Sequence, residues 1–151
     1  MKRLAPYALM LLVLLTTVTG FSQSPNTIKP KQFDNYPSII NCQESELSRI
    51  FSTAEGQDIT VNFSNDLLFP GKLTSNMVKY SNLQSALIKS AQFNNSIFEI
   101  SKITNPDNSI TYTGIIINMN YFDGYELKRD MAGNYKLIKM ETDKVIQSCT
   151  N

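Results

Sequence analysis

Carboxylates are the side chains best suited to acid–base chemistry in this chain, because its 151 residues include no histidine. Without histidine, a serine or cysteine nucleophile lacks its usual activating base, and an ordinary zinc site lacks its commonest ligand. Acidic residues lie close in sequence at Glu44 with Glu46 and at Asp123 with Glu126. A glycosidase needs two carboxyl groups that face each other across a cleft, and short-range pairs do not establish that geometry. A carboxylate-based hydrolase is therefore the least favoured of three functional hypotheses.

The spacing of oxygen ligands and of glycines argues against a bound cofactor. Asp58, Asn65 and Asp66 offer calcium ligands, but their spacing does not match the twelve-residue calcium loop, and turn or cap roles explain them. The six glycines are scattered among turns and form no phosphate-binding loop. We expect no catalytic residue, no metal and no cofactor, and we predict that the protein is not an enzyme.

The N-terminus has the layout of a secretory signal peptide. A short positive end, Lys2 and Arg3, precedes an apolar run over residues 4–19, and Ser22 offers a small residue at a cleavage site. The alternative is an uncleaved membrane anchor, for which the apolar run is short, since a span needs about 20 residues. We assign residues 1–22 to the signal peptide. The mature protein is expected to be periplasmic or secreted, with no membrane insertion after cleavage.

The charge of the mature chain is nearly balanced. Loss of Lys2 and Arg3 from the 14 basic residues leaves 12 against 13 acidic ones, a net charge of −1. No basic cluster is present to attract nucleic acid or an anionic membrane surface. We expect neither kind of partner.

The two cysteines, Cys42 and Cys149, form an even pair in a chain predicted to be exported. One disulfide between them is the simplest interpretation in an oxidising compartment. It would close a long loop, which the chain-entropy description values at about 4 kcal/mol. The alternative is a redox pair or a reactive thiol, but catalytic dithiols usually lie close together as Cys-x-x-Cys. We predict a structural disulfide.

Five aromatic residues gather in the predicted β-rich part of the chain, where they could form a binding surface for a ligand or a glycan. The candidates are Tyr112, Tyr121, Phe122, Tyr125 and Tyr135. The alternative is that they form cross-strand pairs within a sheet, because strands select Tyr and Phe for packing alone. The packing interpretation is favoured, and the binding surface is kept as a candidate.

These side chains must be positioned by one compact domain, because a chain of 151 residues has room for a single domain once a leader is removed. We place this domain at residues 39–151. The residues between the leader and the domain, 23–38, carry three prolines among polar residues and little periodicity. Such a composition is typical of an exposed, flexible lead-in.

Two capping-box patterns predict two helices. Asn41 with Glu44 begins the first, which presents one apolar face and ends at Gly56. Ser81 with Gln84 begins the second, whose inner face carries leucine and alanine at helical spacing. Both helices would lie on the same side of a sheet.

Alternating apolar residues predict strands for the rest of the domain. The strands cover residues 59–63, 72–78, 97–103, 110–121, 125–129 and 135–140. Turn signals separate the later ones, above all the Asn-Pro-Asp-Asn run at 105–108. We therefore predict an α+β fold, in which two helices pack on a mainly antiparallel sheet that ends in C-terminal β-hairpins.

The helix and strands over residues 47–103 also carry a family resemblance. It starts with the helix at 47–54 and Gly56, continues through the strands at 58–61 and 71–74, and closes with the strand at 97–100. Residues 82–87, Asn-Leu-Gln-Ser-Ala-Leu, correspond to a small helix with a Leu-x-x-Ala-Leu core. In these features the segment resembles the STN domain, the short N-terminal module of secretins and TonB-dependent receptors. The resemblance implies a non-catalytic docking domain of the periplasm, and it carries over no fixed functional residue.

Three functional hypotheses follow. The first is a small exported binding or docking module of the bacterial cell envelope, whose partner is another envelope or secreted protein; it predicts an exposed strand edge or an apolar groove. The second is a secreted enzyme inhibitor or immunity-type protein, which predicts a protruding loop at residues 105–109 or 131–134. The third is the hydrolase, which predicts a cleft with converging carboxylates.

Overall fold

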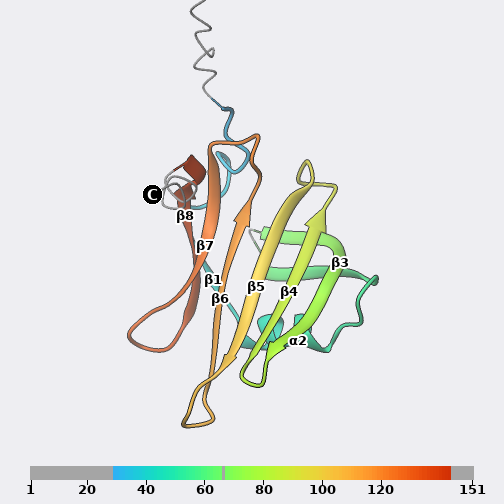
Figure 1. The fold of residues 1–151 in the computed structure, drawn as a ribbon. Helices are drawn as coiled ribbons and strands as arrows, with labels where there is room; N and C mark the ends of the chain where they lie inside the picture. The colour runs from blue at the N-terminus through green and yellow to red at the C-terminus, as the bar shows by residue number, and fades with distance from the viewer. Residues whose placement is uncertain (1–28, 66, 144–151) are drawn as a thin grey trace, which may run out of the picture.

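The computed structural model describes residues 29–65 and 67–143, which form one helix and eight strands (Figure 1). The helix is α2 (Glu44–Ser52), and the strands are β1 (Ile39–Cys42), β2 (Asp58–Ser64), β3 (Leu67–Tyr80), β4 (Leu83–Ser90), β5 (Ser96–Thr104), β6 (Ile110–Ile117), β7 (Asp123–Arg129) and β8 (Tyr135–Glu141). The predicted signal peptide, residues 1–22, lies outside the described residues. Within the described part, no helix has the length and apolar character needed to cross a membrane.

The strands form a single antiparallel sheet in the order β1-β8-β7-β6-β5-β4-β3-β2. From β2 to β8 each strand pairs with its neighbour in sequence, and only β1 crosses to the far edge, where it pairs with β8. The sheet curls until its two edge strands, β1 and β2, lie next to each other without ladder pairing. The result is a nearly closed barrel with one seam.

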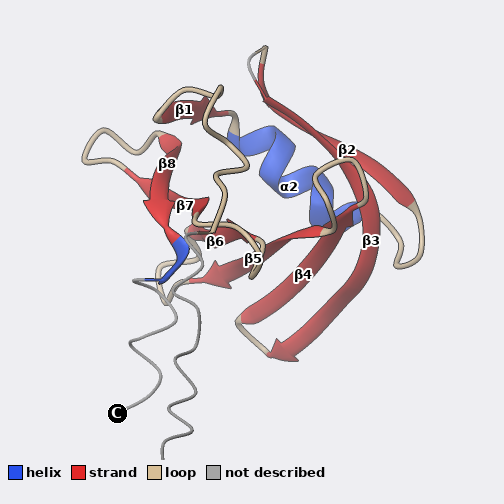
Figure 2. Ribbon diagram, turned by 90° about the horizontal axis from the view of Figure 1, so that it is seen from above, coloured by secondary structure: helices blue, strands red, loops and turns tan. Residues whose placement is uncertain are grey.

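Helix α2 connects the two edge strands and lies across the open side of the curled sheet (Figure 2). It buries Leu47 and Ile50. Its polar face satisfies the free edge of β2: Glu46 accepts the backbone N–H of Asn62 at 3.2 Å, and Arg49 donates to the carbonyl of Thr60 at 2.6 Å. Arg49 also donates to Glu46 at 2.7 Å and thereby lowers the pKa of that carboxyl group. The helix thus closes the seam that the strands leave open.

The interior of the barrel is filled by side chains. Along β2 the inward positions are apolar and buried while the outward ones are polar, as expected for a strand with one buried face. Four phenylalanines form a continuous aromatic cluster in which neighbouring ring centroids lie 5.2–6.5 Å apart; these are Phe63, Phe69, Phe93 and Phe98. These buried side chains fill the centre of the barrel, which is therefore a packed hydrophobic core.

The predicted α+β fold with two helices is wrong, because the segment expected to form the second helix is strand β4. Leu83, Ala86 and Leu87 have helical spacing, but the buried face of β4 follows a period of two through Ala86, Ile88 and Ser90, and Ser85 is buried as well. Pairing with β3 on one side and β5 on the other satisfies the backbone of β4 along its length. Tertiary pairing therefore overrides the local capping signal, and the fold is mainly β.

The first predicted helix is present but shorter than expected. Asn41 does not cap it, since this residue belongs to β1; the N-cap is Gln43, which makes no side-chain capping bond. The helix ends at Ser52, and Gly56, with a φ of +86°, lies in the loop that follows. The backbone conformation at Gly56 favours glycine, but it serves a loop and not the helix end.

Residues 29–38, which the sequence places in the lead-in, pack onto one end of the barrel and are called the strap below. Phe33 of the strap is completely buried in the main core. Residues 23–28 lie outside the described part of the chain. The apolar contact comes from Phe33 and from Tyr36, which packs against the core, and two aromatic residues among prolines and polar residues give no periodic pattern in the sequence.

Candidate functional site

The most unusual feature of the sheet is the separation of β6 from β7. Their ladder contains three residue pairs, whereas β5 and β6 share eight and β7 and β8 share seven. The pairing ends at Gly114 and Leu127. Beyond this point the β5–β6 and β7–β8 hairpins diverge (Figure 1). Two strand edges without a ladder partner therefore lie in the middle of the sheet, away from the seam that α2 covers.

Gly114 marks the point of separation. A Cβ atom added there would lie 2.7 Å from the carbonyl oxygen of Glu99 on β5 and 3.0 Å from the ring of Phe98. Only glycine fits at this approach, since real Cβ atoms essentially never come so close to another atom. Glycine inside a strand often marks a close backbone approach of this kind.

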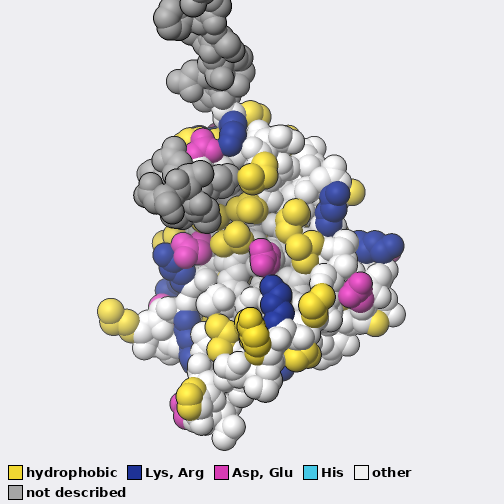
Figure 3. Space-filling model, in the orientation of Figure 1, with side chains coloured by type: hydrophobic (Ala, Val, Ile, Leu, Met, Phe, Trp, Pro, Cys, Tyr) yellow, Lys and Arg dark blue, Asp and Glu magenta, His cyan; other side chains and the backbone are white. Residues whose placement is uncertain are grey.

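A cleft of about 570 Å³ opens on the outer face where the strands diverge. Its lining comes from β5, β6 and β7 and comprises Glu99, Ser101, Thr111, Tyr112, Thr113, Gly114, Ile115, Glu126, Leu127, Lys128 and Arg129. We call it the β6–β7 cleft. In Figure 3, which looks onto the side of β5, β6 and β7, apolar side chains are interspersed with acidic and basic ones. The surface around the cleft is thus mixed in polarity.

The charges of the cleft belong to both signs. Lys128 and Glu126 form an ion pair at 2.9 Å. Glu99 makes no ion pair within the described residues. Arg129 donates to the carbonyl of Gly133 at 3.1 Å and lies over the ring of Tyr135, 5.7 Å from its centroid. A carboxylate and hydroxyl-bearing threonines are therefore available to a bound molecule.

The buried Tyr112 lines the inner side of the cleft, and the buried Tyr135 packs against it. Tyr112 and Tyr135 meet edge to face with ring centroids 5.6 Å apart, and Phe51 of α2 stacks on Tyr112. The backbone N–H of Tyr112 donates to the Tyr135 hydroxyl at 3.0 Å. Burial raises the pKa of the Tyr112 hydroxyl above its usual value, so this ring stays neutral at physiological pH.

The two hairpin tips beside the cleft are held by short polar contacts. In the β7–β8 tip, Asp130 accepts from the backbone N–H groups of Ala132 and Asn134 and pairs with Lys136. These contacts, the Lys136 bond first, lower the pKa of Asp130 to about 2. Met131 at this tip is fully exposed.

The β5–β6 tip is organised in a similar way. Asp107 accepts from both the backbone N–H and the hydroxyl of Ser109, at 3.0 and 2.6 Å. These two bonds lower the pKa of the Asp107 carboxyl group. Asn108 adopts a φ of +65°, which asparagine tolerates in turns.

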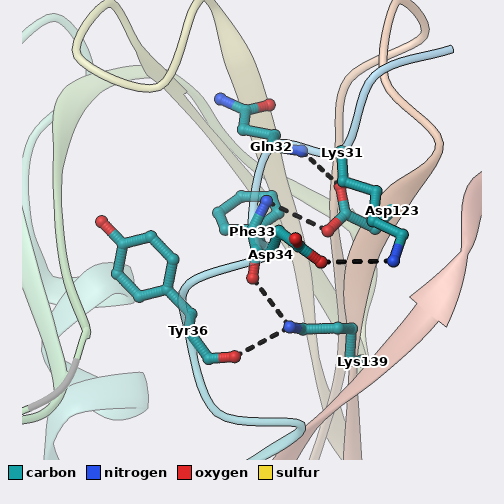
Figure 4. A network of polar contacts seen from close by, with 7 residues as sticks. All are labelled: Lys31, Gln32, Phe33, Asp34, Tyr36, Asp123 and Lys139. Carbon is teal, nitrogen blue, oxygen red and sulfur yellow. Dashed lines mark hydrogen bonds and ion pairs between the residues drawn. The ribbon is translucent and has the colours of Figure 1, made fainter.

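At the opposite end of the barrel, Asp123 and Lys139 hold the strap (Figure 4). The Asp123 carboxylate accepts the backbone N–H of Gln32 at 2.6 Å and that of Phe33 at 3.0 Å. The Lys139 ammonium donates to the carbonyls of Phe33 at 2.7 Å and of Tyr36 at 2.8 Å. Asp123 is buried, and a buried carboxylate needs such donors to offset its desolvation. We call this end of the barrel the mouth.

A second cleft, of about 600 Å³, lies outside the mouth, between the strap and the outer side of β7 and β8. Its lining includes Lys31, Asp34, Phe122, Glu126 and Lys139. Lys31 and Asp34 pair at 3.2 Å, and Lys139 is engaged with the strap. The Lys31–Asp34 pair therefore stays within the strap, while Lys139 fastens the strap to β8.

The predicted binding surface of five aromatics divides into two groups. Tyr112, Tyr125 and Tyr135 are buried in the core, where they pack against other rings. Tyr121 and Phe122 are half-buried near the mouth, and Phe122 lines the cleft beside the strap. The five do not form one surface, since three of them face inward.

The predicted disulfide is not found. Cys42 is a free, half-buried cysteine at the seam, and Cys149 lies outside the described residues. Burial raises the pKa of the Cys42 thiol to about 12. At physiological pH this thiol is protonated, and the thiol form is not the nucleophile.

The acidic residues considered for catalysis and calcium do not converge. Glu46 is bound by Arg49 at the seam, whereas Asp123 is committed to the strap. Asp58 and Asn65 lie at opposite ends of the β2 region, and Asp66 is outside the described residues. No group of three or more potential metal ligands occurs among the residues that the structure describes.

Sequence reasoning missed both the β6–β7 cleft and the contacts by which Asp123 and Lys139 hold the strap, which we call the Asp123–Lys139 clamp. The only signal for the cleft was Gly114, which reads from sequence as a possible bulge. No sequence signal pairs Asp123 with Gln32 and Phe33, which are some 90 residues away.

Comparisons with protein-family models, with curated proteins and with solved structures find no match for this chain. Residues 82–87 correspond in the sequence to the small helix of the STN domain, but in the structure residues 83–87 belong to β4 and Asn82 lies in the turn before it.

Proposed function

We propose that this chain is a small exported binding module of the bacterial cell envelope, without enzymatic activity, that binds an extended segment of another protein in the β6–β7 cleft. The observation that carries the proposal is the early end of the β6–β7 ladder, which stops after three residue pairs and leaves two strand edges facing a cleft. An extended segment placed there would continue the sheet, a recurrent mode of peptide recognition.

The register of β6 determines which backbone groups face the cleft. In an antiparallel ladder, the N–H and C=O of successive residues point alternately to the two neighbouring strands. Tyr112 directs its N–H away from β5, since this N–H reaches Tyr135 on β8. By alternation, Ile110 shares this direction, and the carbonyls of both residues lie on the cleft side. The two carbonyls and the N–H of Ile110 are suited to pair with an added strand, whereas the N–H of Tyr112 is already bound by the Tyr135 hydroxyl.

The dimensions and charges of the cleft fit the same occupant. About 570 Å³ lies within the range of about 300–1,000 Å³ that is usual for binding sites. Thr111 and Thr113 line the outer side of β6, while Lys128 and Glu126 line that of β7. The main chain of the added segment would supply affinity, and its outward side chains would meet these polar groups.

The proposal is tested by closing the cleft with a reversible bond. If the β6–β7 ladder continued by one pair beyond Gly114 and Leu127, Thr113 would lie opposite Lys128. Thr113→Cys with Lys128→Cys, in a chain that also carries Cys42→Ser and Cys149→Ser, would lock the strands together when oxidised. We expect the reduced form to retain a partner from the native envelope and the oxidised form to lose it.

The matched control places the disulfide in an intact ladder. Asp58 lies opposite Lys72 on β2 and β3, so Asp58→Cys with Lys72→Cys adds a cross-strand bond without closing the cleft. The control should retain the partner in both redox states. Equal retention by the oxidised and reduced cleft variants, or recovery of only a sugar polymer, would refute the proposal.

A second candidate function, an inhibitor or immunity-type protein, is favoured by the β7–β8 tip. Polar contacts fix this loop, and Met131 is fully exposed at its end. A loop that is already rigid loses less conformational entropy when it binds a target, which favours tight binding. Met131→Asp separates the two functions. An inhibitor would lose its target with this substitution and keep it when the cleft is closed, whereas the binding module would behave in the opposite way.

A further inference from the structure

The strap is recognised mainly through its backbone. Four hydrogen bonds of the Asp123–Lys139 clamp end on backbone atoms of Gln32, Phe33 and Tyr36 (Figure 4). A fifth runs from the Tyr125 hydroxyl to the carbonyl of Pro37 at 2.6 Å. The mouth thus has the chemistry of a receptor for an extended segment.

An aromatic side chain supplies the apolar part of this recognition. Phe33 is fully buried, and its ring lies 5.2 Å from that of Tyr125 and 5.6 Å from that of Phe93. Tyr36 adds a contact to Phe93 at 6.0 Å. The Gln32 amide joins the mouth as well, donating to the carbonyl of Phe93 and accepting from Ser96. A segment that fits the mouth therefore carries glutamine and phenylalanine next to each other, with tyrosine three residues after the phenylalanine.

The strap and β1 form one arm, residues 29–42, that is attached to the barrel along a single ladder. β1 pairs with β8 on one side, and its other side faces the seam without ladder pairing to β2. The strands from β2 to β8 form a continuous sheet without the arm. Gln43, between the arm and α2, has an extended backbone (φ −83°, ψ 133°) and makes no side-chain capping bond. The arm can leave as a unit if the chain turns at this residue.

We propose that the mouth also accepts the arm of a second copy of this chain, so that two copies exchange arms to form a dimer. The contacts that hold the arm in one copy can form in the same way between two copies, since the two copies have identical arms and identical mouths. Exchange competes with the tethered arm, whose effective concentration is on the order of mM for a short connection. Dimers therefore form as the protein concentration approaches that range. This proposal is independent of the β6–β7 cleft.

The experiment traps β1 of one copy against β8 of another. Ile39 lies opposite Ile138 in the ladder, and both are on the outer side. One chain carries Ile39→Cys and the other Ile138→Cys, each with Cys42→Ser and Cys149→Ser. The two mature chains are mixed near 1 mM, the order of the effective concentration above, and oxidised. We expect a mixed disulfide at least tenfold more abundant than that formed by Ile39→Cys with Lys89→Cys, an exposed position on β4.

Competition by a synthetic arm distinguishes exchange from random collision. The probe is a peptide of residues 29–42 with Cys42→Ser, and its control carries Phe33→Ala as well. The native peptide should suppress the 39–138 disulfide, because it occupies the mouth, and the control should not. Equal yields for the 138 and 89 positions, or a yield that neither peptide changes, would overturn the proposal. Because only surface positions of the chain are substituted beyond the two cysteines, the readout does not depend on a core variant folding.

Discussion

The hydroxyl oxygen of Tyr135 lies 3.0 Å from the backbone nitrogen of Tyr112 and accepts its hydrogen bond. At this point β6 and β7 have separated, so no carbonyl of β7 pairs with that amide. A side chain from β8 therefore takes the place of the missing ladder partner, and both tyrosines are almost fully buried. A buried contact of the core thus stabilises the separation of the two strands, and with it the cleft on the outer face.

Tyr135→Phe removes this acceptor while keeping the ring. The buried N–H of Tyr112 is then unsatisfied, which costs about 1–3 kcal/mol. We expect the free energy of unfolding, measured by urea titration, to fall by that amount. Tyr121→Phe is the matched control, because the described residues offer its hydroxyl no hydrogen bond. A loss that is equal in the two variants would contradict the assigned role of Tyr135.

Asp123→Asn tests the clamp on the strap. The carboxylate accepts two backbone N–H groups, and an amide offers one oxygen and a donor in its place. Hydrogen bonds to a charged group contribute about 1.5–3 kcal/mol, so we expect a stability loss in that range. Hydrogen exchange at the amides of Gln32 and Phe33 should accelerate more than exchange elsewhere in the sheet.

The control for the clamp is Asp34→Asn, which removes an exposed ion pair with Lys31. Pairs of this kind contribute about 0–1 kcal/mol, so stability and exchange should stay near those of the parent. Unchanged exchange at Gln32 and Phe33 in Asp123→Asn would show that the strap is held by Phe33 packing alone.

Gly114→Ala tests the close approach beside the cleft. The added methyl would meet the carbonyl oxygen of Glu99 at 2.7 Å, so β5 and β6 must shift apart. Overpacking of this kind costs about 1–3 kcal/mol, to be read from thermal or urea unfolding. Thr113→Ala, at the next and exposed position, should change stability by less than about 0.5 kcal/mol. Equal stability of the two variants would show that the backbone accommodates a side chain there.

The later strands were predictable because their signals are local. The predicted strands at 97–103 and 135–140 match β5 (Ser96–Thr104) and β8 (Tyr135–Glu141) within one residue at each end. Strong turn residues bound these strands, and alternation sets their faces. The predicted strand at 110–121 ends earlier, at Ile117, because Asn118 begins a turn by accepting the backbone N–H of Tyr121.

The second helix was mispredicted because two periodicities coexist in one segment. Leu83, Ala86 and Leu87 fit a helix, while Ala86, Ile88 and Ser90 fit a strand with one buried face. Which pattern is realised depends on β3 and β5, which lie on either side of β4 and are paired with it throughout. No local rule contains that information.

The candidate sites depend on contacts that sequence patterns do not encode. The β6–β7 cleft is set by how many pairs a ladder forms, and the strap by a carboxylate some 90 residues away in sequence. The sequence contains Gly114 and Phe33 but does not indicate their roles, which depend on their contacts with Glu99 and Asp123 in the folded chain. The pairing of residues that are far apart in sequence thus determines both the cleft and the strap contacts.

The reactivity of Cys42 should depend on pH in a way that its burial determines. Burial raises the pKa of this thiol from an ordinary value of 9.0 to about 12 in the folded protein. Since the thiolate is the reactive form, we expect alkylation by iodoacetamide at pH 8.5 to be slow in the native chain and fast in urea. A chain with Cys149→Ser reports Cys42 alone, and mass spectrometry gives the rate.

The same shift predicts how stability changes with pH. Below pH 9 the thiol is protonated in both the folded and the unfolded state, so its contribution to stability is fully present. Between about pH 9 and 12 the unfolded state loses the proton first, and the free energy of unfolding falls as pH rises. Cys42→Ala should lose less stability across this window, although Tyr125, whose pKa burial also raises to about 12, imposes the same slope on both chains. Parallel losses in the two chains, or rapid alkylation of the native thiol at pH 8.5, would show that Cys42 is open to solvent at the seam.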